Sequence, residues 1–167
     1  MQTPDVVVKL VGKKGRVPGK KVFQKLVYFL QECEGIPLGL TFRMKHYGPF
    51  SEELEDLADD LAQQGRISIS DRGDNGFEIS VVGRTPELDS SLNEKIDSLL
   101  DKVGSEGGLT LELLATIHFL AGGRAFAARI DESEMVKRVR AWKGTKYQPA
   151  FIRENLKKLI EIGYLTQ

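Results

Sequence analysis

The sequence contains little cysteine, histidine or tryptophan. Among its 167 residues there are one cysteine, one tryptophan and two histidines. A single cysteine cannot form a disulfide within the chain, so we interpret Cys33, which lies in an apolar helical run, as a small buried hydrophobic residue in a reducing compartment. A structural zinc site needs four close ligands, whereas Cys33, His46 and His118 have no paired spacing. We therefore expect no metal and no cofactor.

Long apolar runs are also lacking. The longest stretches, such as Leu113 to Ala121, are shorter than the ~18 to 20 residues that a membrane span requires. The N-terminus has neither a basic leader nor a site that resembles a signal-peptide cleavage site. These absences predict a cytoplasmic protein that does not enter the membrane.

The net charge is zero, yet the charges are unevenly placed. Residues 1 to 48 hold nine bases against three acids, and residues 124 to 158 hold ten bases against four acids. Residues 49 to 64 hold six acids and no base. Charge of one sign in one segment affects the choice of partner more than the total does.

Apolar spacing in the first half predicts two helices and a β-hairpin. Apolar residues between Lys20 and Cys33 recur at spacings of three and four, which predicts a central core helix. Ser51 is a good N-cap for an acidic helix that ends at Gly65. Ile67 to Ser70 and Phe77 to Val81 alternate around a turn-rich segment and predict the hairpin. Helix, helix, hairpin is the order of a winged helix.

Two further segments of the first half are less regular. Val6 to Val11 has the propensity of a strand, and its structure stays open at this stage. Gly12 to Gly19 is expected to be a loop. Leu40 to His46 alternates like a short extended segment, and Tyr47, Gly48 and Pro49 form a structural turn with Gly48 at positive φ.

The second half predicts helices only. Thr85 and Pro86 predict the start of a connector helix that runs to Val103. Further helices are expected over Thr110 to Ala121, from Asp131 and Glu134 to Trp142, and from Pro149 onward. We therefore expect an α+β, mainly helical protein with two winged-helix-like halves, residues 1 to 84 and 85 to 167, and one wing hairpin in the first.

The first half resembles the YwgA-like family of small prokaryotic proteins and, more distantly, the Panacea domain of antitoxins related to SocA. The resemblance covers roughly residues 5 to 82 and depends on three motifs: Lys21 to Phe29, Gly35 to Leu38, and His46 to Leu54. It implies a winged-helix type of fold, with Val6 to Val11 as a helix. It also implies a role in regulation or toxin neutralisation rather than catalysis.

No catalytic site is expected. Gly15 to Lys21 resembles a phosphate-binding loop, but its glycine spacing is one residue short and Lys21 stands where a magnesium-binding Ser or Thr is needed. We interpret it as a basic turn that does not bind nucleotides. The acidic residues Asp56, Asp59 and Asp60 are expected on a solvated helix face, where their charge repels phosphate and suits a protein partner. His118 is expected to be a satisfied core residue, and His46 either has a role of its own or fixes the turn with a hydrogen bond.

Bases and aromatic residues interleave in the C-terminal half, a pattern that favours contacts with DNA phosphates. The predicted nucleic-acid-binding residues are Arg138, Lys143, Lys146, Arg153, Lys157 and Lys158. The alternative is an ordinary basic surface that pairs with the acidic helix of the same or a neighbouring molecule, which leaves a homodimer open.

The sequence thus favours a non-enzymatic regulator, transcription-associated or antitoxin-like, that binds DNA, a protein partner, or both. A pure protein adaptor without DNA binding is the alternative. A small hydrolase or nucleotide-binding enzyme is a third and weaker hypothesis.

Overall fold

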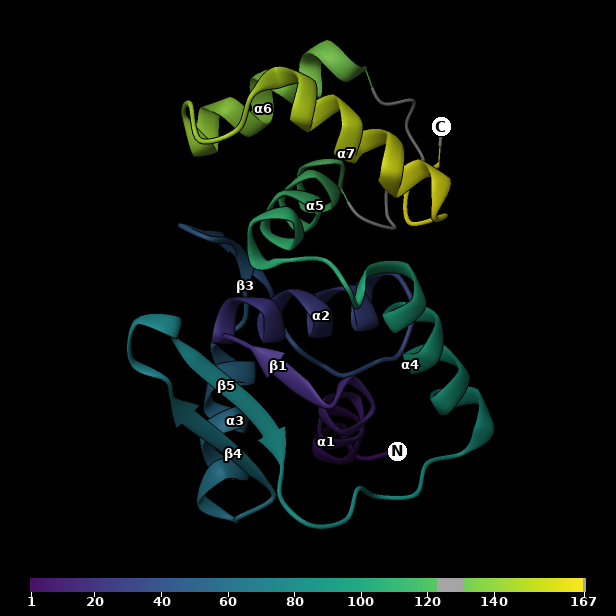
Figure 1. Cartoon of the computed structure of the whole chain (residues 1–167). Coiled ribbons are helices and arrows are strands. Elements are labelled where there is room, and N and C mark those ends of the chain that lie inside the picture. Colours follow the sequence, from purple (N-terminus) through teal and green to yellow (C-terminus); the bar gives the residue numbers. More distant parts are fainter. Residues whose placement is uncertain (123–130, 167) are drawn as a thin grey trace.

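The computed structural model describes residues 1–122 and 131–166. The described part of the chain is α+β and mainly helical, as the sequence predicts (Figure 1). Its elements, in chain order, are α1 Thr3–Lys14, β1 Arg16–Pro18, α2 Lys20–Glu32, β2 Arg43–Lys45, β3 Gly48–Phe50, α3 Glu52–Gln63, β4 Ile67–Asp71, a 3-10 turn Gly73–Asn75, β5 Phe77–Val81, α4 Ser90–Val103, α5 Gly108–Leu120, α6 Glu132–Lys143 and α7 Pro149–Glu161.

Val6 to Val11, whose structure the sequence left open, lies in helix α1. Val6, Val7 and Val8 lie in this helix and are buried, as are Leu10 and Val11. Burial of these side chains outweighs the preference of valine for strands, because helix and strand propensities differ by less than the gain from burying a valine. The helix implied by the family resemblance is confirmed.

The first half has the element order of a winged helix, with a three-stranded antiparallel sheet of order β1-β5-β4. The β4–β5 hairpin lies where the sequence predicts it. The prediction of a loop from Gly12 to Gly19 is wrong over Gly12 to Lys14, which are the last residues of α1, and over β1, where Arg16 to Pro18 pair with Ser80 to Glu78 at the sheet edge. Val17 lies opposite Ile79 and both are buried. Arg16 to Pro18 form a strand because they pair with residues 60 to 64 positions later in the chain.

The Tyr47-Gly48-Pro49 segment belongs to a second, two-stranded hairpin formed by β2 and β3, in which His46 and Tyr47 form the turn and Gly48 and Pro49 begin β3. Gly48 has φ +92°, as expected for a turn that other residues would strain. The Ser51 N-cap of α3 is also confirmed, since its hydroxyl accepts a hydrogen bond from the Leu54 amide.

The connector helix starts later than predicted. Helix α4 begins at Ser90 with Asp89 as its N-cap, so the prediction of a start at Thr85 and Pro86 is wrong. Thr85 instead accepts a hydrogen bond from Lys9, and its methyl group packs against Gly12 of α1. These tertiary contacts hold Thr85 outside the helix. The N-cap of α6 at Asp131 is as predicted.

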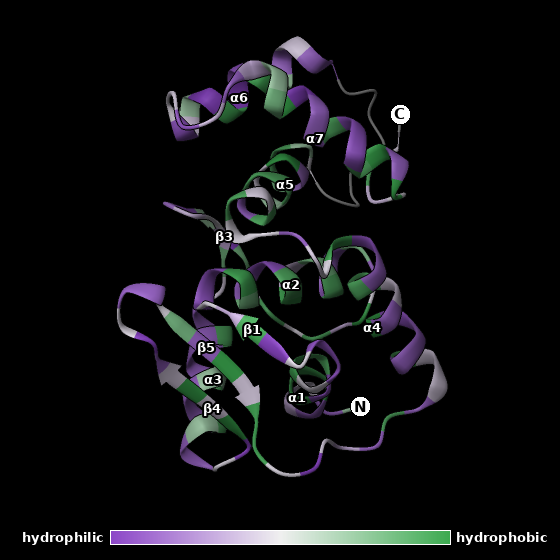
Figure 2. Cartoon of the chain, in the orientation of Figure 1, coloured by the Kyte–Doolittle hydropathy of each residue, from purple (hydrophilic) through white to green (hydrophobic). Residues whose placement is uncertain are grey.

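Helices α2 and α5 join the two halves through one continuous hydrophobic core. Every residue of α2 from Val22 to Leu30 is buried, so the prediction of a central helix is confirmed. Figure 2 shows that α5 is hydrophobic around most of its circumference, which suits a helix covered by α2, β3, α6 and α7. None of the helices in residues 1–122 and 131–166 has the length and hydrophobicity to cross a membrane.

Candidate functional site: a lysine cluster around buried Glu112

The six predicted nucleic-acid-binding residues have different surroundings. Lys143 and Lys146 converge on Glu112 of α5. Lys157 is exposed and forms no ion pair with any described residue. The other three pair with acids of their own half: Arg138 with Glu134 (3.4 Å), Arg153 with Glu132 (3.7 Å) and Lys158 with Glu106. Arg124 and Arg129, which contribute to the basic charge of the second half, lie outside the described residues.

Glu112 is the centre of a polar cluster inside the molecule. Its carboxylate is fully buried and accepts hydrogen bonds from Lys146 (2.7 Å) and Tyr147 (2.8 Å). The ammonium groups of Lys143 and Lys21 lie 3.1 and 3.2 Å from the carboxylate. We call Lys21, Lys25, Glu112, Lys143, Lys146 and Tyr147 the lysine cluster. Its members come from α2, α5, α6 and the loop before α7, so the cluster exists only in the folded chain.

The cluster keeps Glu112 ionised. Burial by itself raises the pKa of a carboxyl group, but hydrogen bonds from Lys146, Tyr147 and Lys143 outweigh it and lower the pKa of Glu112 to about 2. Burial lowers the pKa of Lys143, an effect that Glu112 opposes. Burial likewise lowers the pKa of Lys25 to about 7, opposed by the charge of Glu112.

The lysine cluster holds the Tyr47-Gly48-Pro49 turn in place. Lys25 is buried and donates to the carbonyl of Pro49 (2.7 Å), and Lys143 donates to the carbonyl of His46 (2.7 Å). Thr116 of α5 lies next to Gly48, and its buried hydroxyl has no hydrogen-bond partner among the described residues. The turn is therefore held by hydrogen bonds from α2 and α6 and packs against α5.

Gly48→Val is expected to destabilise the fold by roughly 3 kcal/mol, because a side chain there is strained at positive φ and meets the Thr116 hydroxyl at 2.9 Å. Gly39→Val is the matched control, since Gly39 also has positive φ (+73°) but has no atom within 4 Å of its Cβ position. We expect a loss of about 1 kcal/mol there. Thermal melting of the parent and both variants measures these two losses of stability. If the Gly48 variant melts like the parent yet loses partner binding, the turn is a contact site rather than a structural element.

Tyr47 projects from this fixed turn into solvent. The residue is 55% exposed, and the ammonium groups of Lys21 and Lys146 lie 5.4 and 5.3 Å from its ring centroid. Trp142, which precedes Lys143 on α6, is 56% exposed. The cluster therefore reaches the surface as an exposed aromatic ring flanked by two cations.

His118 is a satisfied core residue, as predicted. Its Nδ1 lies 2.7 Å from the Tyr28 hydroxyl, and its Nε2 lies 3.2 Å from the Cys33 sulfur. Burial raises the pKa of Tyr28 well above its ordinary value, so the phenol stays protonated and we infer that it donates to Nδ1. Nε2 then carries the proton and cannot act as a base toward Cys33. Cys33 itself is only partly buried, contrary to the prediction of a buried hydrophobic residue.

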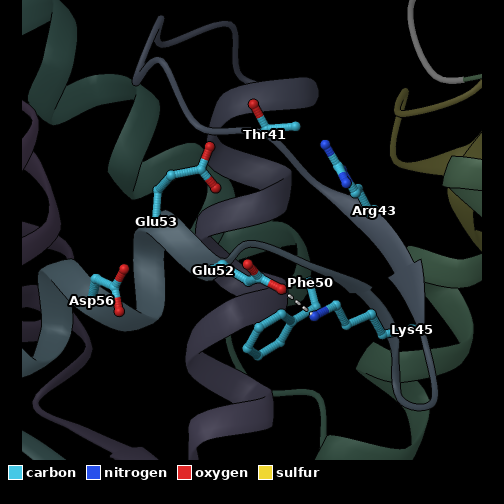
Figure 3. Close-up of a pocket in the computed structure, with 7 residues that line it drawn as sticks. All are labelled: Thr41, Arg43, Lys45, Phe50, Glu52, Glu53 and Asp56. Atoms are coloured by element: carbon cyan, nitrogen blue, oxygen red, sulfur yellow. Dashed lines mark hydrogen bonds and ion pairs between the residues drawn. The ribbon is translucent and has the colours of Figure 1, made fainter.

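A surface cavity of about 280 Å³ lies between the β2–β3 hairpin and the first turns of α3 (Figure 3). Its lining residues are Thr41, Arg43, Lys45, Phe50, Glu52, Glu53 and Asp56. Lys45 bonds to Glu52 at 2.6 Å, so part of the opposite charge is already paired and the pKa of Glu52 is lowered by this hydrogen bond. The cavity is lined by side chains of both charges, so it has no strong preference for an anion or a cation.

The exposed face of α3 carries the predicted solvated acids. Asp56, Asp59 and Asp60 are exposed, and within the described parts of the chain they form no ion pair.

In the Gly15–Lys21 segment, Lys20 lies over the Phe77 ring (4.3 Å) and Lys21 reaches Glu112. Residues 1–122 and 131–166 contain no group of three His, Cys, Asp or Glu side chains placed to hold a metal ion.

In comparisons with known proteins, no family model matches the chain, and neither does any curated protein. The site therefore has to be interpreted from its own geometry. Sequence reasoning found Lys143 and Lys146 but missed Glu112, Lys21 and Lys25. One signal was present: Glu112 is the only acid in the apolar helix α5, and a carboxylate in such a helix needs a partner.

Proposed function

We propose that this protein is a non-enzymatic regulator that binds nucleic acid through the surface of the lysine cluster. The observation that carries the proposal is the imbalance of charge: three ammonium groups share one carboxylate, so the cluster retains net positive charge. Lys21 and Lys146 are about one third exposed, so both can contact a phosphate while remaining beside Glu112.

Helix α3 is unsuited to the same task. It follows α2 in the winged-helix order, at the place of a recognition helix, but its exposed residues are acidic and repel phosphate. Its unpaired carboxylates favour a second function, binding of a basic protein partner. On that alternative the protein is an adaptor without nucleic-acid affinity.

The proposal extends to an antitoxin-like or transcription-associated role in the cytoplasm of a prokaryote. The resemblance of residues 5 to 82 to YwgA-like proteins and to the Panacea domain supports this role. A second copy of the chain remains a candidate protein partner.

Fluorescence anisotropy with mixed-sequence duplex DNA at two salt concentrations tests the proposal. Lys21→Gln with Lys146→Gln is expected to make the negative slope of log affinity against log salt shallower by about two units, because each phosphate contact contributes about 0.9 to its magnitude. Arg153→Ala with Lys157→Ala tests the α7 surface in the same way, and a larger effect there would place the binding face on α7.

Asp56→Ala with Asp59→Ala is the control on the acidic helix and should leave the slope unchanged. Thermal melts establish that each variant is folded. If the parent binds no nucleic acid even at low salt, the nucleic-acid proposal fails and the adaptor takes its place.

A further inference from the structure

Tyr47 has the features of a stacking platform. It lies at the tip of the β2–β3 hairpin, and more than half of its surface is exposed although it is a large aromatic residue. The backbone on both sides of it is tied down, by Lys143 at the carbonyl of His46 and by Lys25 at the carbonyl of Pro49. A ring held on a rigid base loses little conformational entropy when a flat ligand stacks on it.

The charges around the ring select the class of ligand. The ammonium groups of Lys21 and Lys146 lie about equally far from the ring centroid, at 5.4 and 5.3 Å, and both side chains are about one third exposed. A flat group on the ring therefore has a cation close to it from each lysine. A nucleotide strand provides this combination, because each base has a π-face and each linkage carries one negative charge.

A paired duplex does not fit this arrangement as well. Its bases are stacked on one another, and an aromatic side chain reaches their faces only if a base step is opened at a cost of a few kcal/mol. An unpaired strand offers its base faces directly. An acidic peptide matches the charges but has no flat group at regular spacing.

We propose that the lysine cluster surface binds single-stranded nucleic acid, with one unpaired base stacked on Tyr47 and the adjoining phosphates contacted by Lys21 and Lys146. This inference rests on the proposed function and names its ligand class. Trp142 is the only tryptophan in the chain and is exposed beside Lys143, so its fluorescence reports strand binding near the cluster.

The test compares a labelled single strand of about 12 nucleotides with the duplex of the same sequence, by fluorescence anisotropy on the full chain. The parent should bind the single strand more tightly than the duplex and show a change in Trp142 fluorescence. Tyr47→Ala should weaken single-strand binding about tenfold and leave duplex binding within about twofold. Tyr47→Phe keeps the ring and should bind like the parent.

The other outcomes separate the two proposals. If Tyr47→Ala binds the single strand as well as the parent does, or weakens both ligands equally, stacking on Tyr47 is ruled out while nucleic-acid binding stands. If the parent prefers the duplex, the inference is likewise overturned. If it binds neither at low salt, the proposed function itself fails. Because Tyr47 is exposed, its variants should melt like the parent.

Discussion

Glu112→Gln is expected to lower the free energy of unfolding by about 3–5 kcal/mol, the usual cost of breaking a buried ion pair by removing one partner. The amide keeps the size of the side chain but cannot neutralise the surrounding ammonium groups. Lys21 and Lys146 can turn to solvent. Lys143 cannot, since its side chain is 2% exposed, so most of the cost arises there.

Urea unfolding followed by circular dichroism measures this loss. Asp97→Asn is the matched control: it removes an acid from a pair of similar length, Asp97 with Lys13 at 2.8 Å, but at an exposed site. It should cost less than about 1 kcal/mol. Adding Lys143→Met to Glu112→Gln should restore part of the stability, because the double variant no longer buries an uncompensated charge there. Equal losses in the two single variants would mean that the lysine cluster is solvated.

Acidification from about pH 6.5 to pH 4 is expected to remove about 3 kcal/mol of stability through His118 alone. Burial lowers the pKa of His118 from 6.5 to about 4, a shift that a backbone hydrogen bond with Tyr164 only partly opposes. Below pH 6.5 the unfolded chain binds a proton at this residue while the folded chain does not. The stabilisation is therefore complete above pH 6.5 and is lost as the pH falls toward 4.

The measurement is urea unfolding at several pH values for the parent and His118→Gln, which keeps polar contacts but does not titrate. The difference between the two should shrink by about 3 kcal/mol across this range. Glu112 contributes its own pH dependence below pH 4.5 and Lys25 contributes above pH 7, but both act equally in the parent and in the variant and cancel in the difference. A variant with the pH slope of the parent would show that another group causes the loss.

Several local features of the fold could be predicted from the sequence because their causes are local. The apolar spacing of α2, the Ser51 hydroxyl at the start of α3 and the glycine of the Tyr47-Gly48-Pro49 turn each act within a few residues. Strand β1 and the start of α4 could not be predicted. Val17 is extended because it pairs with Ile79, and Thr85 stays outside the helix because it contacts α1.

The candidate site was only partly predictable for a related reason. Lys143 and Lys146 stand out in the sequence as bases beside aromatic residues, but nothing near them indicates that they surround an acid. Glu112 lies 34 residues before Lys146 and 91 residues after Lys21, and no spacing rule connects such positions. The isolated carboxylate in an apolar helix predicts that some partner exists without naming it.

The sequence by itself determined helices α2, α3, α5, α6 and α7, the N-caps of α3 and α6, the wing hairpin, the positive φ of Gly48 and the uneven distribution of charge, since each depends on neighbouring residues. Tertiary structure alone decided which charged side chains pair within the chain and which remain available to a partner. A lysine has the same charge in any sequence context, but the energy of that charge depends on burial and on the distance to the nearest counter-charge. Folding sets both quantities: it places the ammonium groups of Lys21 and Lys146 close to the Tyr47 ring, and it pairs Arg153 and Lys158 of α7 with acids.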